Sequence, residues 1–552
     1  MSWRKRQKLP PTIQVHLVDR HNVEVFPRRM SIEQKNLIQK VLGQPKRKLK
    51  YRVSHAQSLP LQKLAMDHKW EYESIPLIIL ELLDKMDKRK LDKFDTEQKP
   101  EFVKLWKQLH PHQQYGVLRT VQYFKGRVLL GDEMGLGKTH TGTAVVSYYA
   151  HEGRTLIVCP SYLRFHWETA LIDLASVLPE HIHVVSKATD APTTPFVIVS
   201  YDILSRDDCK MTFDFNMLLC DESHYLKNRK AKRTLKVLQI SKTCKRIMFM
   251  TGTPATNRPI ELYSQLHIIR PAFAKYSTHF AKRYCDGKMT DYGYDERGHS
   301  CDEELHWLLK NVYMIRRLKR DILDLPPKTR QKVILPVDDE HLVDINQGFK
   351  EWSGINQSLM HTTDSAIKIK KQHALKKLVS DMFRMTATAK LKTMQSWMKN
   401  LIDSDQPFLF FAYHMETLNA MEELCKDQAY MRIDGSTKPD IRQQHVQHFQ
   451  NGTVRIALLS IMAAGTGLTL TAASTVVFGE LYWVPGVMLQ CEDRVHRLSQ
   501  KHNVTIYHLI GRHTLDDRVY QRLIKKLKTL DTMVDQREDR TIEGTEEILD
   551  II

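Results

Sequence analysis

Three features that would narrow the class of this 552-residue sequence at once are missing from it. Its eight cysteines are scattered without a C-x-x-C pair, which argues against a zinc module and a disulfide framework and suits a reducing compartment. Apolar runs such as IPLIIL and TVVFGELYW are far shorter than the roughly 20 residues that span a bilayer. MSWRKRQKLPP has no apolar core behind its basic residues, so it does not read as a secretory signal. We expect neither a membrane protein nor a zinc protein.

Acidic residues are scarce at the start of the chain. The first fifty residues carry 13 lysines and arginines against 3 acids, within a net charge of +19, whereas residues 51–100 are balanced at 9 against 9. A basic arm on a basic body is typical of a polyanion binder. The runs RKRQK and KRKLK suit either nuclear import or phosphate contacts. Residues 1–95 hold no other motif, and we interpret them as a basic accessory region with DNA as its candidate ligand.

From residue 127 short β-type runs alternate with helical stretches. The runs are RVLL, RTLIVC, PFVIVS, FNMLLC and RIMFM, and after a mostly helical middle they resume with PFLFFAY, AYMRI, VRIALL, STVVFG and VTIYHLI. This alternation predicts an α/β protein with two parallel-sheet lobes, each covered by helices on both faces. The Pro-Pro step near Leu325–Val333 should end a helix and begin an extended crossing segment. The predicted units are lobe 1 at 96–330, a helical linking segment at 331–390, lobe 2 at 391–535 and an acidic tail at 536–552.

GDEMGLGKTH, residues 131–140, follows a predicted strand and precedes a predicted helix. Gly135 and Gly137 would let backbone amides point at phosphate oxygens, and the helix N-terminus favours the same anion. Lys138 would neutralise the β- and γ-phosphates, and the Thr139 hydroxyl would hold Mg²⁺. The strict G-x-x-x-x-G-K-[ST] pattern lacks its first glycine. The predicted ATP-binding loop comprises Asp132, Glu133, Met134, Gly135, Leu136, Gly137, Lys138 and Thr139.

An acidic pair in LLCDESHYLKN follows another apolar run. Asp221 would coordinate Mg²⁺, and Glu222 would orient and deprotonate the attacking water. Adjacent acids are common on surfaces, but an acidic pair at a strand end downstream of a phosphate loop is much more specific. His224 would either relay between nucleotide and polymer sites or make a structural hydrogen bond.

QCEDRVHRLSQ places Gln490, Arg494, Arg497 and Gln500 at helical spacing, which predicts that they share one helix face. Such a set also suits an ordinary charged surface helix. Guanidinium groups, however, are what a phosphoryl-transfer site takes from a second domain to stabilise developing charge. If Arg494 and Arg497 reach a nucleotide on lobe 1, hydrolysis requires lobe closure, as expected of a motor.

Taken in order, GDEMGLGKT, DESHYLKN, MTGTPATN, RIDGST and QCEDRVHRLSQ resemble the Swi/Snf-type ATPases of helicase superfamily two. FFAYH and VVFGELYWVPG look closest to the annealing-helicase (HARP-like) branch, the fork-remodelling DNA translocases. The resemblance covers about residues 105–520 and implies two RecA-like lobes with helical insertions, ATP and Mg²⁺ as cofactors, and catalysis by Lys138, Asp221, Glu222, Arg494 and Arg497.

Further roles are implied only by this resemblance. Gln113 matches the glutamine that reads adenine, while Gly465, Gly467 and Gln500 match positions facing ATP. Thr251, with Gly252 and Thr253, matches the motif coupling ATP state to DNA grip, although T-G-T-P also caps helices. Trp483 either lies near DNA or packs in the core. The residues expected at the DNA are Pro160, Ser161, Thr251, Gly435, Ser436, Ser460 and Trp483. The usual final HRIGQ is HRLSQ here, with Ser499 in place of a glycine.

The sequence therefore favours a nuclear, DNA-dependent ATPase that translocates on forks, junctions or single-strand/double-strand boundaries. A single-strand DNA-binding protein is a candidate partner. Sequence-independent phosphate contacts should weaken steeply with salt. The alternatives are a nucleosome-remodelling ATPase, although no segment reads as a histone-tail module, and an ATP-gated DNA clamp without turnover. An RNA helicase is less favoured, because DESH and ELYW look like the DNA branch.

Overall fold

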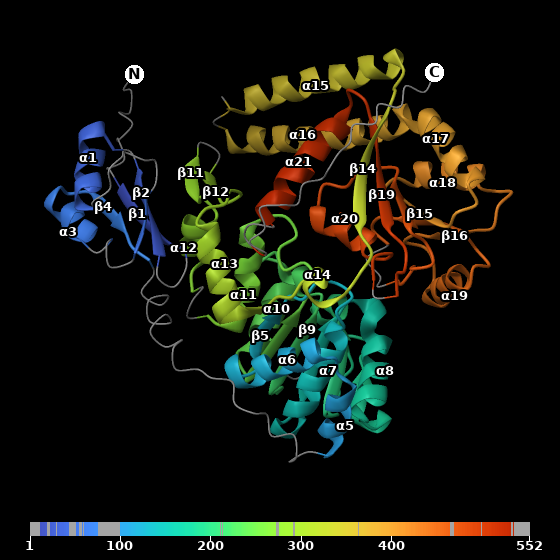
Figure 1. Ribbon diagram of the computed structural model, residues 1–552, viewed down its shortest axis with the longest axis horizontal. Helices are drawn as coiled ribbons and strands as arrows, with labels where there is room; N and C mark the ends of the chain where they lie inside the picture. The colour runs from blue at the N-terminus through green and yellow to red at the C-terminus, as the bar shows by residue number, and fades with distance from the viewer. Residues whose placement is uncertain are drawn as a thin grey trace.

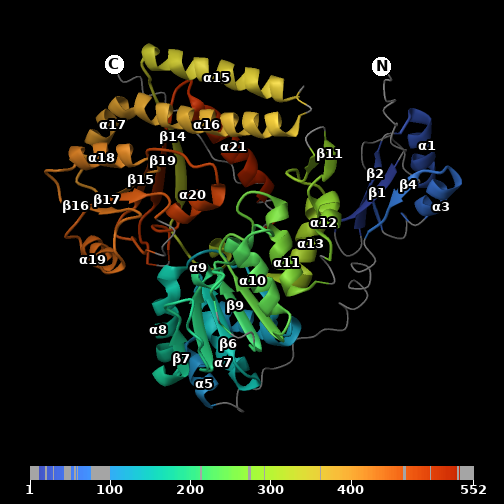
Figure 2. The ribbon, with the colours of Figure 1, turned by 180° about the vertical axis from the view of Figure 1, so that it is seen from behind.

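The computed structural model describes residues 12–18, 22–28, 30–42, 51–54, 58, 60–75, 100–209, 211, 214–271, 275–290, 293–360, 362, 364–463, 468–497, 499–530 and 534. These form a small N-terminal unit beside two α/β lobes (Figure 1), seen from behind in Figure 2. The two basic runs and the acidic tail lie outside the described residues. Within the described ranges, no helix is long and apolar enough to cross a membrane.

In its described residues, the N-terminal unit has a four-stranded sheet and two helices. Strand order is β3-β2-β1-β4, and Ile13, Val15 and Leu17 alternate on its buried face. Ser31 begins the first helix with a capping box to Gln34. The region without a nameable motif is thus a folded unit. Its elements are β1 (Thr12–Leu17), β2 (Asn22–Arg28), α1 (Ile32–Val41), β3 (Tyr51–Ser54), α3 (Pro60–Asp67) and β4 (Glu71–Glu73).

Lobe 1 is built on an all-parallel seven-stranded sheet in the order β13-β5-β10-β9-β6-β8-β7. Its five expected strands are present, and the short strands β7 and β13 are added at the two edges. The strands are β5 (Arg127–Leu130), β6 (Thr155–Cys159), β7 (Ile182–Val184), β8 (Phe196–Ser200), β9 (Met217–Asp221), β10 (Arg246–Met250) and β13 (Met314–Ile315). The described helices before β10 are α5 (Pro100–Gln108), α6 (Pro111–Leu118), α7 (Lys138–Tyr149), α8 (Arg164–Ala175), α9 (Tyr201–Leu204) and α10 (Lys232–Ser241).

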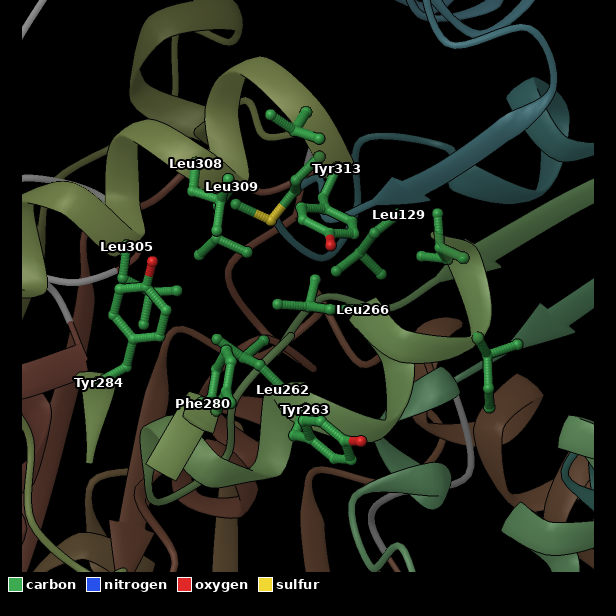
Figure 3. Packing of buried hydrophobic residues seen from close by; sticks show 14 of the residues in the cluster. Leu129, Leu262, Tyr263, Leu266, Phe280, Tyr284, Leu305, Leu308, Leu309 and Tyr313 are labelled. Carbon is green, nitrogen blue, oxygen red and sulfur yellow. The ribbon is translucent and has the colours of Figure 1, made fainter. Parts of the chain in front are cut away.

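Between β10 and β13 a helical insertion packs onto the sheet. It comprises α11 (Tyr263–Ile269), α12 (Ser277–Tyr284), the hairpin β11 (Lys288–Thr290) and β12 (Gly293–Asp295), and α13 (Asp302–Leu308). Figure 3 shows Leu266 beside Leu129 of β5, and Phe280 beside Leu262. The same core cluster includes Ile13 and Val15 of the N-terminal unit, so the insertion connects that unit to lobe 1.

Lobe 2 is built on an all-parallel six-stranded sheet in the order β14-β19-β18-β15-β17-β16. Its strands are β14 (Lys328–Leu335), β15 (Phe408–Ala412), β16 (Tyr430–Ile433), β17 (Ile456–Ser460), β18 (Thr475–Phe478) and β19 (Val504–Gly511). Its helices are α15 (Asp339–Met360), α16 (Ser365–Ala389), α17 (Leu391–Asp403), α18 (Met415–Leu424), α19 (Pro439–Gln450), α20 (Pro485–Glu492) and α21 (Leu515–Leu530). Two α/β lobes confirm the predicted fold class.

The chain crosses between the lobes through α14 (Lys319–Ile322) and the Pro-Pro step. The extended segment that follows is β14, which pairs with β19 along its whole length. The boundary drawn at residue 330 therefore falls inside a lobe 2 strand. The long helices α15 and α16 then run side by side, within the segment expected to be helical.

Candidate active site

The polar motifs of lobe 1 lie at one edge of its sheet. Strands β5, β10, β9 and β6 are consecutive neighbours, and all run in the same direction. Their carboxyl ends carry the loop 131–137, Thr251, Asp221 with Glu222, and Pro160 with Ser161. Four segments far apart in the chain are thus brought to the edge where open parallel sheets bind ligands.

The loop before α7 has the backbone geometry of an anion site. Gly135 and Gly137 have φ of +84° and +73°, a region that side chains other than glycine rarely adopt. A Cβ on Gly137 would also lie 2.2 Å from Gln113 Nε2. The helix α7 begins immediately at Lys138, so its N-terminus faces the same space.

Lys138 reaches back across this loop. Its Nζ donates to the carbonyl oxygens of Asp132 (2.9 Å) and Glu133 (3.4 Å). Burial lowers the pKa of Lys138, although Glu222 and Asp132 nearby favour its charged form. A partly buried ammonium group that donates to carbonyl oxygens of its own loop is well placed to neutralise an incoming anion.

The two acids at the start of the loop are held by the residues that follow β13. Arg317 donates to both oxygens of the buried Asp132 carboxylate, and Lys319 N donates to Glu133 Oε2 at 2.8 Å. The Asp132 side chain therefore anchors the loop, and the backbone carbonyl oxygen of Asp132 accepts from Lys138. Sequence reasoning missed Arg317 and Lys319. Their signal was the basic IRRLKR directly after the apolar strand.

The acidic pair is held rigidly at the end of β9. Trp167 Nε1 donates to Asp221 Oδ2 at 3.0 Å, and Tyr201 OH donates to the Asp221 carbonyl oxygen at 2.8 Å. Burial, followed by the charge of Glu222, raises the pKa of Asp221 to about 6. A second anion beside it makes this a place where a cation would be favourable.

Glu222 has a left-handed backbone, with φ of 49°. Burial alone would raise its pKa, but the hydrogen bond from His224 and the charges of His224, Lys138 and Arg494 lower the pKa overall. Glu222 is thus an ionised acceptor at neutral pH, as a general base requires.

His224 joins the acidic pair to Thr251. His224 Nδ1 lies 3.2 Å from Glu222 Oε2 and 3.1 Å from Thr251 Oγ1. The same hydroxyl accepts from Thr253 N at 3.1 Å, and Thr253 in turn lies 3.4 Å from Gln490 Nε2 of lobe 2. His224 thus makes the structural hydrogen bond that was one of its two expected roles. The His224 side chain also lies on a continuous path of contacts from Glu222 to the other lobe.

The expected single helix face for Gln490, Arg494, Arg497 and Gln500 is wrong. The helix α20 ends at Glu492, and the later residues lie in turns. The physical reason is that the carbonyl oxygens that would continue the helix accept from other groups, Asp493 O from Arg497 Nε (2.9 Å) and Arg494 O from Leu470 N (2.9 Å). The two acids at the helix end are held by ion pairs. Glu492 binds Arg330 (2.6 Å) and Lys328 (3.1 Å), while Asp493 binds Lys319 (2.9 Å).

Lys319 also donates to the His496 carbonyl oxygen at 2.7 Å, and His496 contacts the Pro326 carbonyl oxygen at 3.0 Å. These contacts hold the segment that carries both arginines, which we call the arginine turn (residues 493–497). Lys319 is 3% exposed. Through Glu133 and Asp493 it connects the loop of lobe 1 to the arginine turn of lobe 2.

The arginine turn faces the loop of lobe 1. A Cβ on Gly135 would lie 3.6 Å from Lys319 Cε and 3.8 Å from Arg497 Cγ. A pocket of about 650 Å³ is lined by Gly135, Gly137 and Thr139 from lobe 1 and by Thr469, Arg497 and Ser499 from lobe 2. The structure thus brings Arg497 and the predicted loop to one pocket.

Both arginines are in an environment that favours an anion. Arg494 is 3% exposed, and among the described residues its Nε has no hydrogen-bond partner. Burial, followed by the charge of Arg494, lowers the pKa of Arg497 to about 10. Arg497 donates to the Asp493 carbonyl oxygen at 2.9 Å and to Thr469. An anionic ligand between the two guanidinium groups would relieve their repulsion.

The two predicted glutamines are placed differently. Gln113 lies beside the loop, where Nε2 donates to the Leu136 carbonyl oxygen at 3.3 Å and Oε1 accepts from His110 N at 2.9 Å. It lines a second pocket of about 1030 Å³ together with Gly135, Leu136, Gly137 and Arg317. Gln500 is buried in lobe 2, with both ends of its amide bonded to backbone groups of that lobe. Gly465 and Gly467 lie outside the described residues.

The residues expected at the DNA lie at the carboxyl edges of both sheets. In lobe 1 these are Pro160, which is buried, and Ser161, which is exposed. In lobe 2, Gly435 and Ser436 follow β16 and Ser460 ends β17; the Ser436 hydroxyl donates to Asp434 at 2.6 Å. Trp483 packs against Phe383, with ring centres 5.1 Å apart. Its role at DNA stays a prediction.

This geometry, with an anion loop on one α/β lobe and two arginines on the other, is that of a two-lobed phosphoryl-transfer ATPase. A family model described as the SNF2-related domain matches residues 102–400, and one described as the helicase conserved C-terminal domain matches residues 389–499. The chain belongs to the SNF2-related family, which confirms the resemblance read from the motifs.

Two curated relatives show how much of the chain is shared. It is 38% identical over 439 residues to the SWI/SNF-related matrix-associated actin-dependent regulator of chromatin subfamily A-like protein 1 of Xenopus tropicalis, covering 77% of this chain and 45% of that protein. It is 37% identical over 464 residues to the DNA annealing helicase and endonuclease ZRANB3 of Mus musculus, covering 80% and 42%. The chain thus spans less than half the length of these two relatives.

A solved structure is also similar. This is the Sulfolobus solfataricus SWI2/SNF2 ATPase core in complex with dsDNA, at a TM-score of 0.37 and 22% identity, covering 77% of this chain and 92% of that one.

Proposed function

We propose that this protein is an ATP-driven DNA translocase that remodels or anneals branched DNA, as an annealing helicase does. The observation that carries the proposal is the shared pocket, where the lobe 1 loop and Arg497 of lobe 2 line one space. A site completed only when two lobes meet couples turnover to lobe movement. The names of the relatives, which include an annealing helicase, support DNA as the polymer.

ATP and Mg²⁺ are the cofactors that the residues fit. Gly135 and Gly137 with the α7 N-terminus supply backbone donors, and Lys138 supplies a buried cation. Thr139 and Asp221 would hold Mg²⁺. The raised pKa of Asp221 is the observation that suits a cation, because its carboxylate is buried beside a second anion. Bound Mg²⁺ would neutralise charge on the phosphates.

Hydrolysis would be divided between the lobes. Glu222 is ionised and would take the proton of the attacking water. Arg494 and Arg497 would stabilise the charge that develops on the transferred phosphoryl group. Thr251 and His224 contact Glu222 and lead toward Gln490, so they would transmit the nucleotide state to the DNA-gripping edge.

DNA would bind along the carboxyl edges of the two sheets. Pro160, Ser161, Ser436 and Ser460 lie at strand ends there and would grip phosphates without reading bases. Nuclear action and a single-strand DNA-binding protein as partner belong to the same proposal. They follow from DNA as substrate and from the unpaired strands that branched DNA contains.

A nucleosome-remodelling ATPase is the second candidate, and the printed name of the chromatin-regulator relative favours it. ATPase assays with matched forked DNA, duplex DNA and nucleosomes separate the two. We expect forked DNA to stimulate turnover most strongly. Equal stimulation by nucleosomes, accompanied by nucleosome sliding, would assign the protein to remodelling.

The alternative without turnover, an ATP-gated clamp, is tested by Glu222→Gln. We expect kcat to fall by roughly 10²–10⁴-fold, because the general base is lost. ATP and DNA binding should stay within a few-fold, since neither depends on that proton transfer. Glu340→Gln, at an exposed acid on α15, is the control. Fork remodelling that persists without turnover would establish the clamp.

A further inference from the structure

The carboxyl edge of lobe 2 carries large side chains in a row, and two of the three are exposed. Strands β18, β15 and β17 are direct neighbours, and Tyr482, Tyr413 and Met462 follow them in that order. Backbone bonds from Gly479 N to Phe411 O (2.9 Å) and from Ile461 N to Ala412 O (2.9 Å) hold the three strand exits side by side. We call Tyr482, Tyr413 and Met462 the edge row.

Two members of the edge row are exposed, although a phosphate-gripping surface needs only polar groups, and Tyr482 is partly buried. Tyr413 is 37% exposed and Met462 is 58% exposed, and Met415, two residues after Tyr413, is 43% exposed. Single exposed apolar residues are common, but a row at the predicted DNA edge indicates an apolar ligand surface.

The aromatic part of the row is rigid. The rings of Tyr413 and Tyr482 stack with centres 5.4 Å apart and planes 24° apart. Phe383 backs Tyr413 at 5.5 Å. Behind them the buried Glu480 accepts from Tyr413 N (2.6 Å) and His414 N (2.8 Å), and it pairs with His414 Nδ1 (2.6 Å). The ring of Tyr413 is therefore held in place before any ligand arrives, which lowers the entropic cost of stacking on it.

Positive charge adjoins the row. Lys526 Nζ donates to the carbonyl oxygen of Trp483, the residue after Tyr482, at 3.0 Å. The charges of Arg258 and Arg522 act on Lys526, and its pKa is lowered first by burial and then by these two arginines. Basic side chains beside exposed aromatic rings are the combination that binds single-stranded nucleic acid.

We propose that the edge row binds unpaired nucleobases of single-stranded DNA where it leaves a duplex, by stacking on Tyr413 and by contact with Met462. Neighbouring strands lie about 4.8 Å apart, so the row spans about 10 Å, enough for about two or three bases. Duplex bases present no free faces, so this contact selects partly single-stranded DNA. The inference rests on the proposed DNA translocase function and names its substrate feature.

The test measures the DNA concentration for half-maximal ATPase stimulation with three DNAs of equal charge and duplex sequence. The first is a blunt duplex extended to equal phosphate number, the second carries a single-stranded thymidine arm, and the third carries the same arm with abasic sugars. We expect the wild type to prefer the thymidine arm over the abasic arm by about 5- to 100-fold, as stacking of one base predicts. Tyr413→Ala should remove this preference, and Tyr413→Phe should keep it within about twofold, since the ring is retained.

Tyr276→Ala removes a 51% exposed tyrosine from lobe 1 and is the matched control, expected to keep the wild-type preference. A 2-aminopurine base in the arm gives a direct readout, with quenching on binding that Tyr413→Ala loses. Equal response of the wild type to thymidine and abasic arms would overturn the edge row while leaving duplex-stimulated translocation intact. Absence of stimulation by all three DNAs would instead overturn the proposed function. Equal loss on blunt duplex and armed DNA in Tyr413→Ala would show general damage to DNA binding and also overturn the inference.

Discussion

The two lobes have the same architecture, yet they hold their chemical groups in different ways. In lobe 1 the carboxylate of Asp221, the base Glu222 and Lys138 are bonded by groups of that same lobe, such as Trp167, Thr251 and the Asp132 carbonyl oxygen. In lobe 2 the arginine turn follows a helix that has already ended. Lys319 of the crossing segment and Lys328 of β14 hold the turn at Asp493, and Arg330 of β14 holds Glu492 just before it.

This difference separates binding from turnover. Lobe 1 presents a preorganised anion site without help from its partner. The arginine turn takes two of its contacts, at Asp493 and at the His496 carbonyl oxygen, from Lys319 of the crossing segment. Changes in the lobe 1 loop, such as Lys138→Ala, should therefore affect nucleotide binding, and changes around the arginine turn should affect turnover with binding preserved.

The largest effect is expected from removing the arginines. Arg494→Ala with Arg497→Ala should lower DNA-stimulated kcat by about 10³–10⁵-fold, because charge on the transferred phosphoryl group loses its partners. ATP affinity should change far less than in Lys138→Ala. Steady-state ATPase and nucleotide-binding assays measure both quantities, with the exposed Arg512→Ala as control. Unchanged turnover in the double variant would remove the arginines from the mechanism.

An intermediate effect is expected from Lys319→Met, which cuts the connection between the two lobes. Asp493 would keep only Lys328, at 3.8 Å, and the arginine turn would lose the bond to the His496 carbonyl oxygen. We expect kcat to fall by about 10- to 100-fold, as small misplacement of a reacting group predicts, while ATP affinity stays within a few-fold.

Lys319→Arg should restore part of this loss, because it keeps the charge. Lys328→Met is the matched control from the same cluster, since Arg330 still holds Glu492. Equal losses in Lys319→Met and Lys328→Met would mean that the cluster acts only as structural support.

The smallest effect on catalysis is expected at the contact between the N-terminal unit and lobe 1. Glu304 is fully buried; it accepts from Arg283 (2.6 Å), Tyr284 OH (3.0 Å) and Leu17 N (3.1 Å). Arg283 also donates to the Val15 carbonyl oxygen at 2.9 Å. Glu304→Gln leaves this guanidinium buried without its counterion, at a cost of about 3–5 kcal/mol.

We expect faster proteolytic release of the N-terminal unit in Glu304→Gln, with basal ATPase within about twofold of wild type. The exposed Glu180→Gln is the control. If Glu304→Gln released the N-terminal unit at the wild-type rate, the apolar contact with lobe 1 would be sufficient to hold the unit without this ion pair.

Much of the fold was predictable because buried parallel strands are continuous apolar runs. RVLL and RIMFM correspond to β5 and β10 residue for residue. The N-terminal sheet was missed because its strands, such as TIQVHL and NVEVFPR, alternate apolar with polar residues within a strongly charged region. Strand β14 was missed as part of lobe 2 because its charged residues, among them Lys328 and Arg330, are paired with buried acids far along the chain.

In the candidate site, too, local patterns were predictable and contacts between distant residues were not. The loop at Gly135–Lys138 and the pair Asp221–Glu222 are local patterns attached to strand ends, so the sequence contains their geometry. The arginine turn is not local. Helical spacing predicted one face for Gln490 to Gln500, but the helix ends at Glu492. Beyond it the Arg494 carbonyl oxygen accepts from Leu470 N, and that of His496 accepts from Lys319, 177 positions away. No pattern within QCEDRVHRLSQ contains that information.

Lys319 and Lys328 contact the same corner of α20, one through Asp493 and the other mainly through Glu492. The segment between Lys319 and Lys328 is consequently a linker of fixed span, unlike the flexible linkers that commonly join two domains. One residue inserted between Asp324 and Pro327 would break either the Lys319–Asp493 or the Lys328–Glu492 ion pair. The length of this segment should therefore be more constrained than the identity of its residues.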